Sequence, residues 1–212
     1  MILLISDLIS CHTQGDSTQK DFMTKAKTRE TYLKKRKALS EKEYSMLSHG
    51  LYEKFISHFD METIKVLHTY LPLKKNKEPD TWLLIDWIGV KFPELKISVP
   101  RINYEKKEIE SVYFDDRFQL ETNKWGLEEP VKGSPTVPRD IDIIIVPLLA
   151  FDLHGNRVGY GKGYYDKFLA ACRADCKRVG LSFFEAVDSI SGIEEHDIRL
   201  NYCITPKKFY TF

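Results

Sequence analysis

The chain of 212 residues is 42% hydrophobic, which is enough to bury the core of one domain near the upper end of the usual size range. Its 32 Lys and Arg residues nearly balance 31 Asp and Glu residues, so the formal charge of +1 gives no global field for nucleic acid or an anionic membrane. No apolar stretch approaches the roughly 20 residues of a bilayer crossing. We therefore expect neither nucleic acid nor a membrane as a partner, and any anion site must be local.

Residues 1–22 begin with a short apolar run that differs from a secretion signal. The run contains Asp7, has no basic leader and is followed by no small-residue cleavage pattern. We interpret residues 1–22 as a loosely ordered extension and residues 23–212 as a single α/β domain, expected to be a monomer. The four cysteines include no CxxC pair, which favours reduced thiols and a cytoplasmic location.

Two helices are predicted at the start of the domain. Residues 23–39 contain neither Gly nor Pro and are rich in helix formers. One side of this helix carries three cations, Lys25, Arg29 and Arg36. Ser40, with Glu43 three residues later, forms a capping-box pattern, which predicts a second helix to about residue 59.

A strand, a polar loop and a third helix are predicted next. Residues 64–70 are rich in β-forming residues and predict the strand. Either Asp80 or Thr81 suits the N-cap of a helix through residues 81–92. Two further strands are expected at residues 96–102 and 109–114.

The second half of the chain predicts the centre of a sheet. Residues 115–139 hold several Gly and Pro residues without a sustained period, which predicts an irregular connection over the functional site. Residues 141–147 are a continuous apolar run, typical of a strand buried on both faces. A helix is expected at residues 164–174, and strands at 178–183 and 202–205. This alternation predicts an α/β fold, a three-layer sandwich with a mostly parallel, doubly wound central sheet.

The segment after the apolar strand carries the main functional signal. Residues 151–166 read FDLHGNRVGYGKGYYD, and in open α/β sheets ligands bind beyond the carboxyl ends of such strands. Glycines allow the backbone to approach a ligand closely, while backbone N–H groups and the following helix end attract phosphate. The glycines are Gly155, Gly159, Gly161 and Gly163. Arg157 and Lys162 add positive charge to residues 155–163, which we call the glycine loop.

Two better-known phosphate loops do not fit the glycine loop. A Walker loop fails because Tyr160 is the fifth residue after Gly155 and neither Ser nor Thr follows Lys162. The dinucleotide pattern fails because Asp166 takes the place of a Gly or Ala. A carboxylate in the first turn of a helix has a structural explanation in the helix dipole. Beside a nucleotide, however, Asp166 could hold Mg²⁺, and Asp197 is a second candidate ligand.

Residues 147–166 resemble the marker sequence of the 5-formyltetrahydrofolate cyclo-ligase family. That marker is Pro, an apolar pair, Phe-Asp, then Gly-x-Arg-x-Gly-x-Gly-x-Gly-Tyr-Tyr-Asp. The family's Lys and Arg on the first helix are matched by Lys25 and Arg29, and its Glu-x-x-Thr loop by Glu78 and Thr81. Further matches are Pro100, Arg101, Trp125, Gly126, His196 and Asp197. Departures from the common pattern are Leu148, Ser191, Gly192 and Asn201.

The resemblance implies an enzyme that converts 5-formyltetrahydrofolate to 5,10-methenyltetrahydrofolate with ATP and Mg²⁺. ATP would phosphorylate the formyl oxygen, and ring closure would then release phosphate. Such a transfer needs positioning and charge neutralisation, for which Lys162 and Arg157 are the expected catalytic residues. The implied ATP-binding residues are Lys25, Arg29, Arg157, Gly159, Gly161, Lys162, Gly163, Tyr164 and Tyr165. The implied folate-binding residues are Glu78, Trp125, Tyr164 and Tyr165, and the implied Mg²⁺ ligands are Asp166 and Asp197.

Structural interpretations of the same residues stay open. The cations of the first helix would ordinarily form its solvated face, and the resemblance changes that interpretation for Lys25 and Arg29 but not for Arg36. Glu78 alone is a loop carboxylate, and Trp125 could equally cover the core. Two other functions compete with the enzyme. One is a binding module for nucleotide or folate without turnover, and the other is a sugar-phosphate isomerase that needs no ATP.

Overall fold

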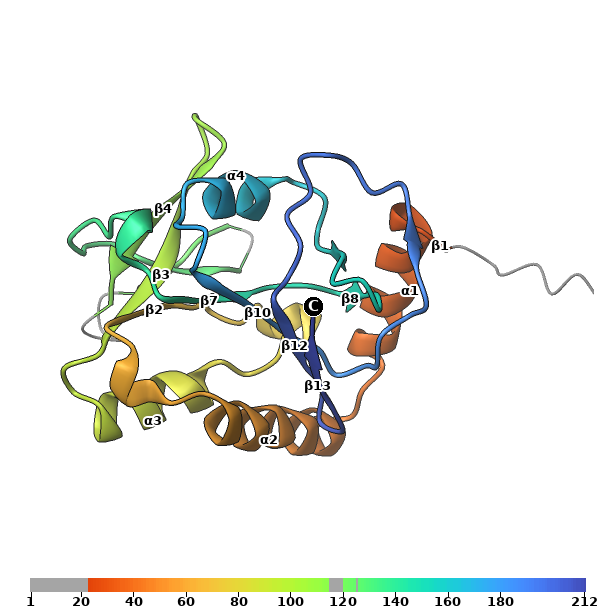
Figure 1. The fold of residues 1–212 in the computed structure, drawn as a ribbon, viewed down its shortest axis with the longest axis horizontal. Helices are drawn as coiled ribbons and strands as arrows, with labels where there is room; N and C mark the ends of the chain where they lie inside the picture. The colour runs from red at the N-terminus through yellow and green to blue at the C-terminus, as the bar shows by residue number, and fades with distance from the viewer. Residues whose placement is uncertain (1–22, 115–119, 125) are drawn as a thin grey trace, which may run out of the picture.

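The computed structural model describes residues 23–114, 120–124 and 126–212, and Figure 1 shows their fold. The predictions for residues 1–22 and for Trp125 lie outside these residues. A seven-stranded sheet forms the centre, in the order β13-β12-β10-β7-β2-β3-β4. Its strands are β2 (Val66–His68), β3 (Lys96–Asn103), β4 (Glu108–Tyr113), β7 (Ile143–Val146), β10 (Lys177–Leu181), β12 (Tyr202–Ile204) and β13 (Phe209–Thr211).

The central sheet is mostly parallel, as the sequence predicts. The five inner strands pair in parallel, while β13 and β4 add an antiparallel strand at each edge. β2 connects through α3 (Trp82–Lys91) to β3 on one side, whereas β7 connects through α4 (Tyr164–Ala170) to β10 on the other side. The winding direction therefore reverses between the neighbouring strands β2 and β7. Ligands bind at such a switch point in doubly wound sheets.

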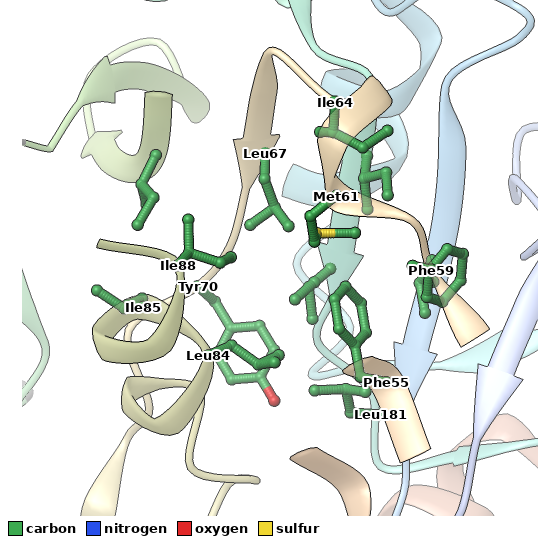
Figure 2. Packing of buried hydrophobic residues seen from close by; sticks show 14 of the residues in the cluster. Phe55, Phe59, Met61, Ile64, Leu67, Tyr70, Leu84, Ile85, Ile88 and Leu181 are labelled. Atoms are coloured by element: carbon green, nitrogen blue, oxygen red, sulfur yellow. The ribbon is translucent and has the colours of Figure 1, made fainter. Parts of the chain in front are cut away.

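Helices cover both faces of the sheet, which confirms the three-layer α/β sandwich (Figure 1). α2 (Glu41–His58) and α3 pack on one face, and α4 packs on the other. Figure 2 shows Phe55 of α2 and Leu84 of α3 within the same apolar cluster as Leu67 of β2 and Leu181 of β10. Burial of each such side chain contributes about 1.5–3 kcal/mol to folding.

Side chains close to the N-termini of α2 and α3 cap the first turns of these helices. Ser40 Oγ accepts a hydrogen bond from the Glu43 amide at 3.2 Å, and the Glu43 carboxylate accepts one from the Ser40 amide at 2.7 Å. The predicted capping box of α2 is therefore confirmed. α3 begins after Thr81, but the side chain that accepts an amide of its first turn belongs to Asp80.

The shorter elements differ from the sequence prediction. α4 ends at Ala170 rather than near residue 174. The connection predicted to be irregular contains a hairpin of β5 (Leu120–Thr122) and β6 (Glu128–Pro130). The remaining elements are α1 (Lys25–Lys37), β1 (Met23–Thr24), β8 (Ala150–Phe151), β9 (Arg157–Val158), β11 (Ile190–Ser191), and the 3-10 turns η1 (Met61–Thr63), η2 (Lys74–Asn76) and η4 (Pro138–Asp140). None of the helices within the described residues has the length and apolar character of a membrane span.

Candidate functional site

A cavity of about 640 Å³ lies beyond the carboxyl ends of β2 and β7. Leu71 follows β2 and Pro147 follows β7, and both line the cavity at the switch point of the sheet. Every predicted site residue that the structure describes also lines it: Lys25, Arg29, Glu78, Arg157, Gly159, Gly161, Lys162, Gly163, Tyr164, Tyr165, Asp166 and Asp197. Trp125 is the predicted folate-binding residue that lies outside the described residues. The fold thus brings segments far apart in sequence to one place.

The glycine loop lies against Arg29 of α1. Arg29 Nε donates a hydrogen bond to the carbonyl of Gly159 at 2.9 Å. Gly161 has a φ of +80°, and a Cβ atom at this position would lie 2.9 Å from Arg29 Nη2. Gly163, with a φ of +70°, then leads directly into α4. The loop can approach the guanidinium this closely because its backbone carries no side chain at Gly161.

Lys25 and Asp197 form an ion pair across the cavity mouth. Asp197 Oδ2 also accepts a hydrogen bond from the Glu194 amide at 2.6 Å. Burial alone would raise the pKa of the Asp197 carboxyl, but the Glu194 amide and the Lys25 ammonium lower it below its usual value. Asp197 therefore carries a negative charge at neutral pH.

Arg157 joins the glycine loop to α4 and to the segment near Asp197. Its side chain is only 6% exposed, and its Nη2 lies 2.8 Å from Asp166 Oδ1. Its Nη1 donates to the Ile198 carbonyl, and the Ile198 amide donates to Asp166 Oδ1 at 3.2 Å. The sequence predicts Arg157 as a phosphate contact, but it gives no signal for these protein contacts. Arg157 orients Asp166 toward the cavity.

Asp166 and Asp197 both line the cavity, and carboxylates suit a hard divalent cation. Within the described residues, no group of three or more His, Cys, Asp and Glu side chains is arranged to hold a metal ion. Mg²⁺, however, is commonly bound by one or two carboxylates together with substrate phosphate oxygens. The protein hydrogen bonds of Asp166 use Oδ1 and those of Asp197 use Oδ2, so each carboxylate has a second oxygen to offer. The residues present therefore fit Mg²⁺.

Glu78 is buried beside the glycine loop rather than exposed on a surface loop. It is 5% exposed, and its two oxygens accept hydrogen bonds from the Leu73 amide at 2.7 Å and from the Tyr160 hydroxyl at 2.5 Å. Burial raises the pKa of the Glu78 carboxyl, although nearby Arg36 opposes this shift. Glu78 is a carboxylate held in place in the cavity lining.

Arg36 corrects one sequence interpretation. Instead of belonging to a solvated helix face, its side chain is 3% exposed and lies 3.9 Å from Glu78 Oε1. Arg36 lies seven positions after Arg29, a spacing that returns to the same helix face. That spacing is the signal that could have placed Arg36 beside Arg29, facing the interior rather than solvent.

The two tyrosines and the lysine of the marker sequence have different environments. Lys162 is exposed at the cavity rim, and among the described residues none forms a hydrogen bond or ion pair with its ammonium group. Tyr165 has a buried hydroxyl that finds no partner within the described part of the chain. Burial raises the pKa of this phenol, so Tyr165 stays protonated and can donate a hydrogen bond to a ligand. Tyr164 is half-buried and also lines the cavity.

A further part of the cavity lining was missed by sequence reasoning. It includes Ile102, Leu127 and Glu129, which come from β3 and from the hairpin of β5 and β6. Glu129 Oε1 accepts a hydrogen bond from the Ile102 amide at 3.1 Å, and Oε2 accepts one from Asn123 at 2.7 Å. This part of the lining combines apolar side chains with a fixed carboxylate. The prediction that residues 115–139 lie over the site is confirmed for residues 127–129.

Comparisons with known proteins agree with this arrangement. Residues 21–206 match the 5-formyltetrahydrofolate cyclo-ligase family. The chain is 29% identical over 177 residues to 5-formyltetrahydrofolate cyclo-ligase of Mus musculus, covering 78% of this chain and 85% of that relative. It is 27% identical over 186 residues to the Mycoplasma pneumoniae protein of the same name, covering 86% and 98%.

Two solved structures are also similar to this chain. Aquifex aeolicus 5,10-methenyltetrahydrofolate synthetase is similar with a TM-score of 0.75 and 30% identity, covering 89% of this chain and 93% of that one. The 5,10-methenyltetrahydrofolate synthetase from Mycoplasma pneumoniae shares the fold, with a TM-score of 0.69 at 24% identity. A family match over most of the chain, joined to a cavity lined by the marker residues, leads to one assignment. The chain belongs to the 5-formyltetrahydrofolate cyclo-ligase family.

Proposed function

We propose that the protein cyclises 5-formyltetrahydrofolate to 5,10-methenyltetrahydrofolate, using ATP and Mg²⁺ and releasing ADP and phosphate. The observation that carries this proposal is the glycine loop, which contacts Arg29 and lines a 640 Å³ cavity together with Lys25. Family membership and the names of the relatives support the folate reaction. The cations and carboxylates of the cavity lining support the use of a nucleotide and a metal ion.

The glycine loop and α1 form the proposed ATP side. Lys25, Arg29 and Lys162 bring three positive charges to one rim, and the close backbone approach at Gly161 leaves room for phosphates beside them. Charge-assisted hydrogen bonds from such groups contribute about 1.5–3 kcal/mol each. Arg157 adds a further cation, held in the wall through Asp166.

Asp166 and Asp197 would hold Mg²⁺ between the protein and the phosphates. A bound Mg²⁺ would neutralise charge on the phosphate oxygens during transfer. The protein's own part is to fix the two carboxylates, through Arg157 for Asp166 and through the Glu194 amide for Asp197. Lys25 would then exchange its contact with Asp197 for one with phosphate.

The apolar and aromatic side chains of the cavity lining suit the folate. Tyr164, Tyr165 and Ile102 offer surfaces for a flat ring, and the Tyr165 hydroxyl can donate a hydrogen bond to it. Glu78 also lines the cavity. It would contribute a carboxylate for the polar edge of the ring, and Trp125 is proposed as a further contact.

The reaction itself explains the need for ATP. An amide oxygen is a poor leaving group, so the formyl oxygen first attacks the γ-phosphorus and ADP departs. Nitrogen 10 then attacks the activated formyl carbon, loses its proton, and phosphate leaves as the five-membered ring becomes the methenyl product. Lys162 and Arg157 would stabilise charge on the transferred group, because phosphoryl transfer depends on positioning and charge neutralisation.

One assay tests the proposal. Purified protein with 5-formyltetrahydrofolate, ATP and Mg²⁺ should generate the methenyl chromophore and one ADP for each product molecule. Omission of ATP or Mg²⁺ in turn should abolish the signal. Tight binding of both substrates without any chromophore would instead identify a binding module, and turnover of a phosphosugar without nucleotide would identify an isomerase.

The expected setting is a monomer in a reducing compartment such as the cytoplasm. Cys172, Cys176 and Cys203 are free thiols in the structure, which supports a reducing environment. Sedimentation of the purified protein would test the monomer.

A further inference from the structure

Arg36 of α1 joins three segments around the cavity. Its Nε donates a hydrogen bond to the Asn76 carbonyl at 2.7 Å, and its Nη1 donates to the Leu148 carbonyl at 3.1 Å. Its Nη2 donates to the hydroxyl of Tyr160 in the glycine loop. Asn76 belongs to the loop after β2, and Leu148 follows β7. A single buried guanidinium therefore connects the two strand ends at the switch point with the glycine loop.

The hydroxyl of Tyr160 is saturated by this network. It donates to Glu78 Oε1 at 2.5 Å and accepts from Arg36 Nη2 and from Asn76 Nδ2, the latter at 3.4 Å. A phenol has one donor and two acceptor positions, so all of them are used. The Arg36 guanidinium carbon also lies 5.7 Å from the centre of the Tyr160 ring. The ring thus has one preferred position.

The position of Tyr160 matters because of its neighbours in the chain. It stands between Gly159 and Gly161, which contact Arg29, and neither glycine has a side chain to restrain the loop. Tyr160 is the side chain that attaches this part of the loop to the protein interior.

We propose that Arg36 is a positioning residue, which acts through Tyr160 to hold the glycine loop against the loop that carries Glu78. Arg36 would thereby fix the nucleotide side of the cavity relative to the folate side. This inference rests on the proposed function, because the proposed function assigns the glycine loop to ATP and the loop with Glu78 to folate.

The variants that test this role must keep the two buried charges of the network, so that a loss of positioning can be told apart from a loss of folding. Arg36 and Glu78 carry opposite buried charges, and removal of either leaves the other uncompensated, which endangers folding itself. Tyr160→Phe avoids this problem, because it keeps both charges and the ring and removes only the shared hydroxyl. Arg36→Lys keeps the charge but loses the planar fork that reaches all three segments.

The experiment compares Tyr160→Phe, Arg36→Lys and the double variant in the methenyl assay with ATP varied. We expect kcat/KM for ATP to fall about tenfold or more in each single variant, the size of one charge-assisted hydrogen bond. The double variant should fall little further, because both changes break the same link. Lys37→Met, which removes an exposed cation from the next position of α1, is the matched control and should keep wild-type kinetics. Additive losses, or lower melting temperatures with unchanged kcat/KM, would overturn the inference.

A binding measurement separates this inference from the proposed function. Calorimetry with a non-hydrolysable ATP analogue should show affinity about tenfold weaker for Tyr160→Phe than for the wild type. If the wild type binds the analogue but makes no methenyl product, the proposed reaction fails and the binding ratio still judges Arg36 and Tyr160. Equal affinity of the two proteins for the analogue would reject the positioning role.

Discussion

A Cβ atom placed on Gly161 would lie 2.9 Å from Nη2 and 3.0 Å from Cζ of Arg29. Real Cβ atoms do not approach other atoms so closely, and the φ of +80° at Gly161 also disfavours any L side chain. A side chain at this position would therefore strain the backbone and displace the Arg29 guanidinium. The Arg29 guanidinium and the backbone of the glycine loop are in direct contact.

Gly161→Ala should consequently weaken the use of ATP by the enzyme. The added methyl group must displace the Arg29 guanidinium and impose a strained φ, so we expect kcat/KM for ATP to fall by a factor of about 10 to 150, the range for one lost charge-assisted contact. Steady-state kinetics with ATP varied would measure this. The chain should remain folded, which circular dichroism checks. Full activity in a folded Gly161→Ala protein would contradict the proposed contact between the loop and Arg29.

Asp197→Asn should raise the Mg²⁺ concentration needed for half-maximal rate. Asparagine can still accept the Glu194 amide, but it offers no charge to a metal or to Lys25. We expect a shift of about tenfold or more, measured by Mg²⁺ titration of the methenyl assay. Because the pKa of Asp197 is below its usual value, the wild-type Mg²⁺ requirement should not change between pH 6 and 8 through this group. Glu195→Gln, an exposed neighbour outside the cavity lining, is the control, and an equal shift in both variants would argue against Asp197 as the ligand.

His68 should make the fold sensitive to acid. Burial lowers the pKa of His68 from 6.5 to about 3, and its Nδ1 lies 3.1 Å from Ser98 Oγ and 2.9 Å from Ser111 Oγ. Between these pKa values the unfolded chain binds a proton that the native protein does not, so stability is lost as pH falls below about 6.5. We expect the free energy of unfolding to drop by about 2 kcal/mol between pH 7 and pH 5 from this group.

Urea unfolding across that pH range would measure the His68 effect. His68→Gln should flatten the slope of stability against pH by close to one proton, whatever its effect at neutral pH. His49→Gln, which removes an exposed imidazole on α2, is the matched control. An unchanged slope in His68→Gln would mean that His68 binds its proton over the same pH range in the native and unfolded states, against this prediction.

The local parts of the site were predictable from sequence, because each is encoded within a few residues. The glycine loop is continuous, and Lys25 and Arg29 are one helical turn apart, so their shared side of α1 follows from spacing alone. The long apolar run at 141–147 likewise predicts a strand buried on both faces. The capping box at Ser40 fixes where α2 begins.

The contacts between distant segments were not predictable in the same way. Arg36 bonds to Asn76, Leu148 and Tyr160, which are 40, 112 and 124 residues away, and no periodic pattern relates them. The hairpin of β5 and β6 has strands of three residues each, too short to show an alternating pattern. Glu129 was missed for that reason. Such positions are set by tertiary packing rather than by propensity.

Gly89 and Gly192 offer a matched test of how backbone conformation affects stability. A Cβ atom at either position would meet no atom within 4 Å, but Gly89 lies inside α3, whereas Gly192 has a φ of +77°. Gly89→Ala should stabilise the protein by about 0.5–1 kcal/mol, because alanine loses less entropy in a helix, and should raise the melting temperature by about 1–4 °C. Gly192→Ala should instead destabilise it by about 1 kcal/mol, since only the unfavourable left-handed conformation differs. Calorimetric melting of both variants checks this, and a shift of the same sign in both would show that space rather than backbone conformation decides the outcome.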